Sequence, residues 1–238
     1  MMKRGKKRSE TGRDFARLNI GNSRLGRGRD GKSKNSHTCS RNAGRTSRFP
    51  VGSLRTGAES NGGGDKSPPA VCQIVGYKNS GKTTLICGLI PLLQRHGCTV
   101  AVIKHDAHDY EMDHPGTDTW QQRQAGASAI AITSGRKTSV IEERSSSLAE
   151  LISAFSSYDY VLVEGFKHEA YPKIVLVHNE EDLSLLNNAQ NKVAAAFWEE
   201  MKDNVWIEPG IRQFSINDSA AIADFLWQQR NYFQNFNI

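Results

Sequence analysis

The residues best suited to chemistry lie in one octapeptide, GYKNSGKT at positions 76–83. The pattern G-x-x-x-x-G-K-T is typical of a loop whose backbone N–H groups surround the phosphates of a nucleotide. Gly76 and Gly81 allow backbone turns that a side chain would block. Lys82 would bring a positive charge to the β- and γ-phosphates, and the Thr83 hydroxyl would hold Mg²⁺. The octapeptide therefore predicts a P-loop that binds a nucleoside triphosphate.

The segments on either side of the octapeptide are the ones that a P-loop requires. An apolar run, VCQIV at 71–75, precedes it, and an apolar run with helical periodicity follows from Thr84. A strand before the loop and a helix after it place the anion at a helix N-terminus, which carries about half a positive charge. We therefore expect this strand, loop and helix to organise the rest of the domain.

A carboxylate for the metal is expected at the end of a second buried strand, DYVLVEG at 159–165. P-loop NTPases hold Mg²⁺ through a carboxylate at such a strand end, directly or through water, so Glu164 is the candidate. Asp113 and Asp118 lie in a polar segment that follows the strand predicted at 99–105. Ligands bind at the carboxyl ends of strands in open α/β sheets, so both are candidates for a second metal contact or for orienting water. We favour Asp113, and assign Lys82, Asp113 and Glu164 as catalytic and Thr83, Asp113 and Glu164 as metal-binding.

Two other patterns do not hold. The segment around His105, His108 and His114 is rich in His and Asp, but its spacing lacks the paired Cys or His arms of a zinc site. Asn191 and Lys192 resemble the start of the guanine-reading N-K-x-D sequence, but alanine occupies the acidic position. The residues alone therefore leave the choice between GTP and ATP open.

Strands and helices alternate along the remainder of the sequence. This alternation behind a P-loop predicts a P-loop NTPase-type, three-layer α/β domain with a mostly parallel sheet. The expected elements are a helix at 82–96 kinked near Pro91, a strand at 99–105, a helix at 119–125 begun by Asp118, a hairpin at 129–134 and 138–142, a helix at 148–157, strands at 159–165 and 174–177, a segment at 193–197 that fits a strand or a helix start, and a final helix capped by Asn217 or Asp218.

Residues 1–70 differ in composition from residues 71–238. The first segment has 17 Lys and Arg against 5 Asp and Glu, whereas the second has 14 against 20. Residues 1–70 also contain twelve glycines and only two aromatic residues. Folding of this segment would bury too little apolar surface to offset the loss of conformational entropy. We expect a disordered basic tail at 1–70 and a nucleotide-binding domain at 71–238.

The basic tail has three possible roles. It could bind nucleic acid, or it could act as a transit peptide. It could also have no specific role, in which case translation could start near Val71. We favour no specific role, because no aromatic residues are interleaved to stack bases.

The four cysteines form no C-x-x-C pair, which favours free thiols and a reducing compartment. No apolar run of about 18 residues and no N-terminal apolar segment typical of a signal peptide is present. We expect a cytoplasmic protein without a membrane span.

Taken together, several motifs resemble those of one family, the MobB adaptors of molybdopterin-guanine dinucleotide biosynthesis. The shared motifs are QIVG at 73–76 with the P-loop, IKH at 103–105 with His108, D-x-P-G-x-D at 113–118, AGA at 125–127, VEGFK at 163–167 and PKI at 172–174. The likeness is close over about 71–177. Thr117 stands where the family's P-G-K-D-S motif has lysine, and the family has no basic leader of 70 residues.

The resemblance implies a GTP-binding, weakly hydrolysing homodimer that assists the molybdenum cofactor guanylyltransferase attaching GMP to molybdopterin. By this resemblance, residues 79–84 would contact the nucleotide. Together with Gly76 and Lys78 of the P-loop, the predicted nucleotide-binding residues are Gly76, Lys78, Asn79, Ser80, Gly81, Lys82, Thr83 and Thr84. Mg²⁺ would lie near Thr83, Asp113 and Glu164. No arginine has a recognisable finger position, Arg123 and Arg136 being the nearest, so we expect slow hydrolysis.

Two other functions remain open. A strand that ends in Glu-Gly also resembles the dethiobiotin synthetases, which would make the protein an ATP-dependent small-molecule kinase or synthetase. A nucleic-acid-binding module driven by the basic tail is the second alternative.

Overall fold

The computed structural model describes residues 67–106, 108–201 and 205–236. The chain divides into two units, 1–48 and 49–238, and every described residue belongs to the second. The predicted basic tail lies almost entirely outside the described residues and stays a prediction. Among the described residues, no helix is both long and apolar enough to cross a membrane.

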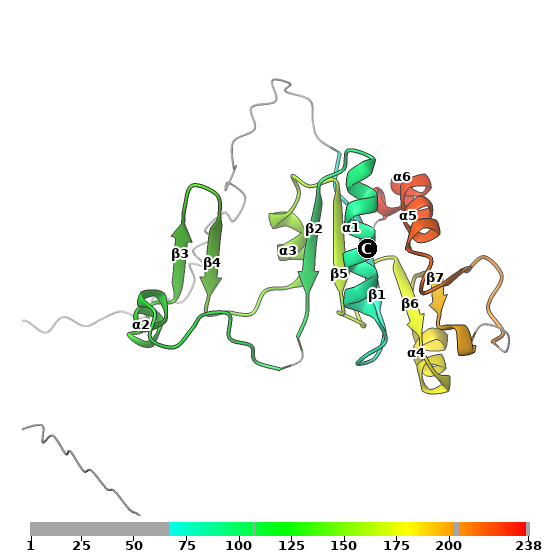
Figure 1. Ribbon diagram of the computed structural model, residues 1–238, viewed down its shortest axis with the longest axis horizontal. Helices are drawn as coiled ribbons and strands as arrows, with labels where there is room; N and C mark the ends of the chain where they lie inside the picture. The colour runs from blue at the N-terminus through cyan, green and yellow to red at the C-terminus, as the bar shows by residue number, and fades with distance from the viewer. Residues whose placement is uncertain (1–66, 107, 202–204, 237–238) are drawn as a thin grey trace, which may run out of the picture. The chain divides into compact units, whose positions relative to one another are not determined.

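A six-stranded sheet forms the centre of the domain (Figure 1). Its strands lie in the order β2-β5-β1-β6-β7-β8, and every neighbouring pair is parallel. The bounds are β1 Ala70–Val75, β2 Val100–Lys104, β5 Tyr160–Glu164, β6 Lys173–Val177, β7 Lys192–Phe197 and β8 Arg212–Ser215. The predicted mostly parallel α/β fold is therefore confirmed, and the ambiguous segment at 193–197 is a strand.

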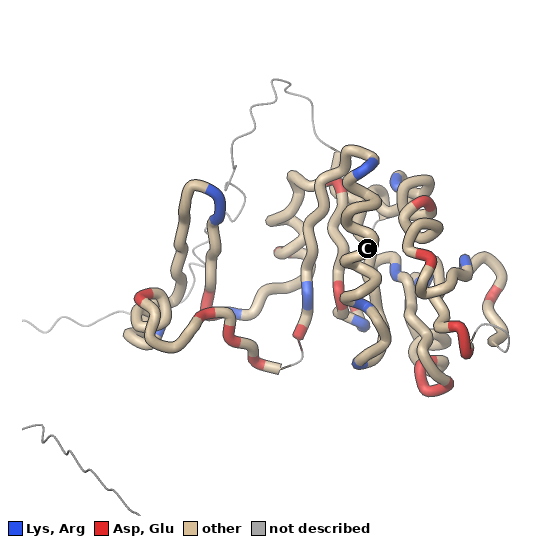
Figure 2. The backbone as a smooth tube through the Cα atoms, viewed as in Figure 1, with Lys and Arg blue, Asp and Glu red and all other residues tan. Residues whose placement is uncertain are grey.

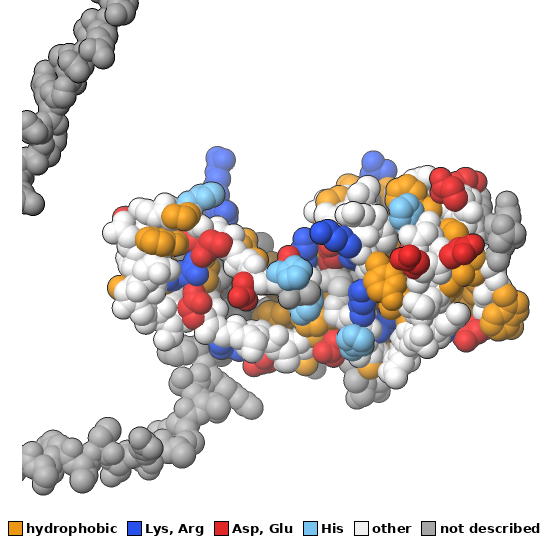
Figure 3. Space-filling view, turned by 90° about the horizontal axis from the view of Figure 1, so that it is seen from below, with side chains coloured by type: hydrophobic (Ala, Val, Ile, Leu, Met, Phe, Trp, Pro, Cys, Tyr) orange, Lys and Arg blue, Asp and Glu red, His pale blue; other side chains and the backbone are white. Residues whose placement is uncertain are grey.

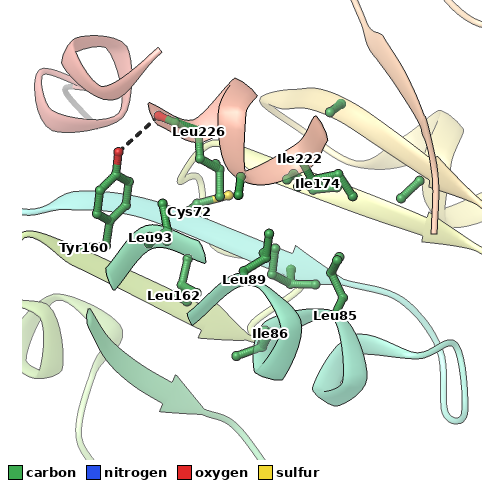
Figure 4. Packing of buried hydrophobic residues seen from close by; sticks show 14 of the residues in the cluster. Cys72, Leu85, Ile86, Leu89, Leu93, Tyr160, Leu162, Ile174, Ile222 and Leu226 are labelled. Carbon is green, nitrogen blue, oxygen red and sulfur yellow. Dashed lines mark hydrogen bonds between the residues drawn. The ribbon is translucent and has the colours of Figure 1, made fainter. Parts of the chain in front are cut away.

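Alternating side chains of β1 divide the core between the two faces of the sheet. Cys72 and Ile74 belong to a cluster that packs against α1 (Lys82–Arg95), α5 (Ser219–Gln228) and α6 (Arg230–Gln234) (Figure 4). Val71 and Val75 point to the other face, where the clusters include residues of α3 (Leu148–Ala154) and α4 (Leu183–Asn188). Helices on both faces explain why the central strands are apolar on both sides. Two short 3₁₀ helices, Glu180–Asp182 and Glu199–Met201, follow β6 and β7.

Helix α1 lies close to the sheet and to α5. Its buried residues are Leu85, Ile86, Leu89 and Leu93, and the helix continues through Pro91. Gly88 allows the approach of α5, because a Cβ there would lie 3.3 Å from the Cβ of Ser219. Tyr160 reaches across the same layer, where its hydroxyl donates to the backbone oxygen of Leu226 (Figure 4). These contacts pack α1 and α5 together on one face of the sheet.

A separate small module contains α2 (Asp118–Gln124) and the antiparallel hairpin of β3 (Ala129–Thr133) and β4 (Thr138–Glu142). We call residues 111–143 the hairpin module. The hairpin prediction is confirmed. The predicted cap of α2, Asp118, was wrong by one residue: Thr117 is the N-cap, because its side-chain oxygen accepts the Trp120 N–H, and the helix covers 118–124 in place of 119–125. Arg123 ties the module together through Glu111 and Glu143, at 2.7 and 2.6 Å.

Candidate functional site

The octapeptide at 76–83 turns tightly between β1 and α1, as its glycines require. A Cβ on Gly76 would lie 2.3 Å from the Ser80 hydroxyl oxygen, which no real side chain could do. Gly81 has a φ of 94°, a left-handed conformation that favours glycine. Asn79 has a φ of 63°, and asparagine tolerates this region better than most residues. Glycine at 76 and 81 and asparagine at 79 therefore suit the backbone conformation of this turn.

Lys82 folds back over this loop. Its ammonium donates to the backbone oxygens of Gly76 at 3.1 Å and Tyr77 at 2.6 Å, and lies 3.5 Å from the Ser80 hydroxyl. Burial lowers the pKa of Lys82, while the nearby Glu164 carboxylate acts in the opposite direction. The ammonium is thus held beside the turn in which a phosphate would sit.

Thr83 and Glu164 meet across the gap between α1 and β5. The Thr83 hydroxyl lies 3.0 and 3.1 Å from the two carboxylate oxygens of Glu164, a residue that is buried at the carboxyl end of its strand. Lys104 ends the neighbouring strand β2 in register with Glu164. Figure 2 shows basic and acidic positions together at this end of the sheet. Figure 3 shows this face of the molecule, with basic and histidine side chains near its middle and acidic side chains beside them. A hydroxyl and a carboxylate facing each other form the oxygen pair that Mg²⁺ favours.

The loop after Glu164 is held from beneath by two buried polar side chains. Gln73 of β1 donates to the backbone oxygens of Gly165 and Phe166, at 3.2 and 2.7 Å. Lys173 of β6, its neighbour in register, donates to the backbone oxygens of Lys167 and Glu169. Burial lowers the pKa of Lys173, with the nearby Glu169 acting in the opposite direction. The two side chains fix a loop that carries one wall of the site.

Three aromatic side chains stand around the P-loop. Trp198, which follows β7, donates its indole N–H to the backbone oxygen of Ser80 at 3.1 Å and packs against His178. Tyr77 lies 40% exposed, with its hydroxyl 3.2 Å from that of Ser184. Phe166 packs against the His105 ring, 4.6 Å between centroids. The P-loop is therefore contacted by the segment after β7, through Trp198, and by α4, through Ser184.

The predicted aspartates have other partners. One carboxylate oxygen of Asp113 accepts from the Thr117 hydroxyl at 2.8 Å and from the backbone N–H of His114 at 3.0 Å. Asp118 occupies the first turn of α2. Among the described residues, no group of three or more His, Cys, Asp and Glu side chains is placed to hold a metal ion. The structure joins Thr83 to Glu164, whereas the role of Asp113 stays a prediction.

Sequence reasoning missed Gln73, Lys167, Lys173 and Trp198. Gln73 had a visible signal, because it is a polar residue inside an otherwise apolar strand. The sequence signal for Lys173 was weaker, because it is a charged residue directly before an apolar run. No local pattern connects Trp198 to Ser80, which is 118 residues away in the sequence.

Comparisons with known proteins agree with this arrangement. Residues 71–198 match the family described as MobB, molybdopterin guanine dinucleotide synthesis protein B. The molybdopterin-guanine dinucleotide biosynthesis adapter protein of Haemophilus influenzae is 35% identical over 67% of this chain and 89% of its own length. The adapter protein of Escherichia coli is 34% identical over 65% of this chain and 90% of its own length.

Solved structures give the same result. The crystal structure of Bacillus subtilis MobB is 30% identical, has a TM-score of 0.58, and covers 68% of this chain and 97% of its own length. A MobB homologue from Bacillus stearothermophilus is 29% identical, with a TM-score of 0.54 over 68% of this chain and 99% of its own. The family match spans more than half of the sequence and includes both the P-loop and Glu164. The chain therefore belongs to the MobB family.

Proposed function

We propose that this protein is a GTP-binding adaptor with weak GTPase activity that acts in molybdopterin guanine dinucleotide biosynthesis. Its relatives are named as adapter proteins of that pathway. The partners would be molybdopterin and the molybdenum cofactor guanylyltransferase that attaches GMP to it. The three described cysteines are free, which fits work in a reducing compartment such as the cytoplasm.

One observation carries the nucleotide-binding part of this proposal. The Thr83 hydroxyl next to the P-loop lysine is bonded to both oxygens of the Glu164 carboxylate at the end of β5. In P-loop NTPases these two positions hold the divalent ion that bridges the β- and γ-phosphates. The residues therefore fit Mg²⁺, which binds through few protein oxygens and keeps phosphates and water as its other ligands. Asp113 is the proposed further ligand.

When bound, Mg²⁺ would neutralise charge on the phosphates. The chain's own residues would do the rest. Backbone N–H groups of residues 79–84 would bind the phosphate oxygens, and Lys82 would exchange its present carbonyl partners for them. Among the described arginines, none makes a hydrogen bond or ion pair with the P-loop, which supports slow hydrolysis. Slow turnover suits a nucleotide-gated adaptor better than a catalyst.

The homodimer is part of the proposal and is supported by the hairpin module. None of the residues of β3 and β4 is buried, and Ile132 and Val140 are 55% and 47% exposed. They point to opposite faces, because Ile132 pairs with Ser139 and Val140 with Ala131. A lone two-stranded hairpin is marginally stable in water, so a second copy of this chain is the proposed partner.

Parallel titration of GTP and ATP with Mg²⁺ into the full-length protein tests the function. GTP should bind more tightly than ATP, and addition of the protein should increase GMP attachment by a guanylyltransferase supplied with molybdopterin. Preference for ATP, with hydrolysis stimulated by a small metabolite, would instead support the kinase or synthetase alternative. Binding of neither nucleotide would refute the proposal.

A further inference from the structure

Lys167, the last residue of the VEGFK motif, lies beside the P-loop. It follows the metal-site candidate Glu164 by three residues. Its ammonium lies 4.1 Å from the centroid of the Tyr77 ring, and Tyr77 is the residue directly after the first glycine of the P-loop. Among the described residues, this ammonium makes no hydrogen bond and no ion pair, so the ring face is its only assigned contact. A lysine ammonium is therefore placed beside the second residue of the loop with its donors available.

The backbone that carries Lys167 is unusually well fixed. Gln73 and Lys173 hold four carbonyl oxygens of the loop, at residues 165, 166, 167 and 169. Both side chains have 0% exposed surface. Burying an ammonium that has only carbonyl partners is unfavourable for folding, so this arrangement is not explained by stability alone. It is explained if the position of the loop matters to the site.

The charges around the loop give a second argument. Lys82 donates to the backbone oxygen of Tyr77 at 2.6 Å, and the Lys167 ammonium lies over the ring of the same residue. Lys167 is thus close enough for its charge to be felt at the P-loop lysine. Several like charges around one loop are destabilising until a polyanion binds between them.

We propose that Lys167 is a second phosphate-binding cation of this site, whose ammonium leaves the Tyr77 ring and contacts the terminal phosphate of the bound nucleoside triphosphate. This inference rests on the proposed function and deepens it. Lys167 would supply a positive charge at the terminal phosphate from the same chain. In other P-loop proteins an arginine supplies this charge. A diphosphate lacks that phosphate, so Lys167 distinguishes GTP from GDP.

The test compares the affinities of the full-length protein for GTP and GDP in the presence of Mg²⁺. Lys167→Ala and Lys167→Met remove the charge, and the methionine keeps the apolar stem over Tyr77. Both should weaken GTP binding by about tenfold or more, the usual size of a charged hydrogen bond, and weaken GDP binding much less. Lys167→Arg should retain the preference for GTP.

Arg95→Ala is the matched control, because it removes one positive charge from the other end of α1, about 20 Å from the P-loop. It should change neither affinity. If Lys167→Met has the same ratio of GTP to GDP affinity as the wild type, this inference is overturned. The proposed function still stands in that case, provided that the wild type binds GTP and Lys82→Ala does not. Failure of the wild type to bind either nucleotide would overturn both.

Discussion

The P-loop core and the hairpin module differ in what stabilises them. Strands β1, β5 and β6 are buried along their whole length, between helices on both faces. In contrast, β3, β4 and α2 contain no buried residue, and ion pairs of Arg123 connect their ends. The core brings Lys82, Thr83 and Glu164 together within one chain. The hairpin module, which includes Asp113, presents exposed side chains that another chain could cover. Changes in the core should affect ligand binding, and changes in the module should affect assembly.

The largest effect is expected for Lys82→Ala. Loss of the P-loop ammonium should weaken GTP binding by more than about 100-fold, because charge-assisted contacts to the phosphates are lost. Its partners in the structure are two backbone oxygens and a hydroxyl, so the melting temperature should change little. Fluorescence titration and thermal unfolding measure the two quantities. Lys137→Ala in the hairpin turn removes the same charge from the other region and should leave affinity intact; equal losses in both variants would remove the distinction between the regions.

Glu164→Gln should have the next largest effect. The amide keeps the size of the side chain but loses the negative charge that would hold Mg²⁺, so affinity in Mg²⁺ should fall by about 30-fold. The affinity measured in EDTA should change far less. Titration of GTP with and without the metal separates the two contributions. Identical Mg²⁺ dependence in the variant and the wild type would show that this carboxylate does not serve the metal.

Val140→Lys tests the hairpin module. A charge on the exposed face of β4 should weaken a dimer by about tenfold or more, because an apolar contact becomes a buried, unpaired ammonium. Sedimentation equilibrium over a range of concentrations gives the dissociation constant. GTP affinity per chain should stay unchanged. A wild-type protein that is monomeric at all concentrations, or a variant with the same dimer constant, would argue against the proposed assembly.

Lys173→Met gives the smallest effect and depends on pH. Because the folded pKa of Lys173 lies below its ordinary value of 10.5, the unfolded chain binds more protons between these two values. The wild type should therefore gain stability relative to the variant as pH rises through this window, by at most about 1.4 kcal/mol per pH unit. Urea unfolding at pH 8 to 10.5 measures the slope. A difference that is constant with pH, or falls as pH rises, would mean that Lys173 is not destabilised by burial.

The same contrast explains what the sequence could predict. The apolar runs of β1, β2, β5 and β6 and the spacing of the P-loop are local patterns, so the parallel fold and the placement of Glu164 near Thr83 were expected. Helix α4 and strand β8 were not predicted, because their segments are short and their patterns weak. The contacts of Gln73, Lys173 and Trp198 with loops elsewhere were also missed, since they depend on which strands become neighbours. Strand order is a tertiary property that no short pattern encodes.

A crystal structure of the full-length protein with Mg²⁺ and a non-hydrolysable GTP analogue tests the central claim most directly. The account predicts the triphosphate inside the 76–83 loop, with Lys82 on its phosphates and the ion at about 2.1 Å from the Thr83 hydroxyl, on the side facing Glu164. A triphosphate bound elsewhere, or a Glu164 side chain turned away from the ion and its water ligands, would contradict it.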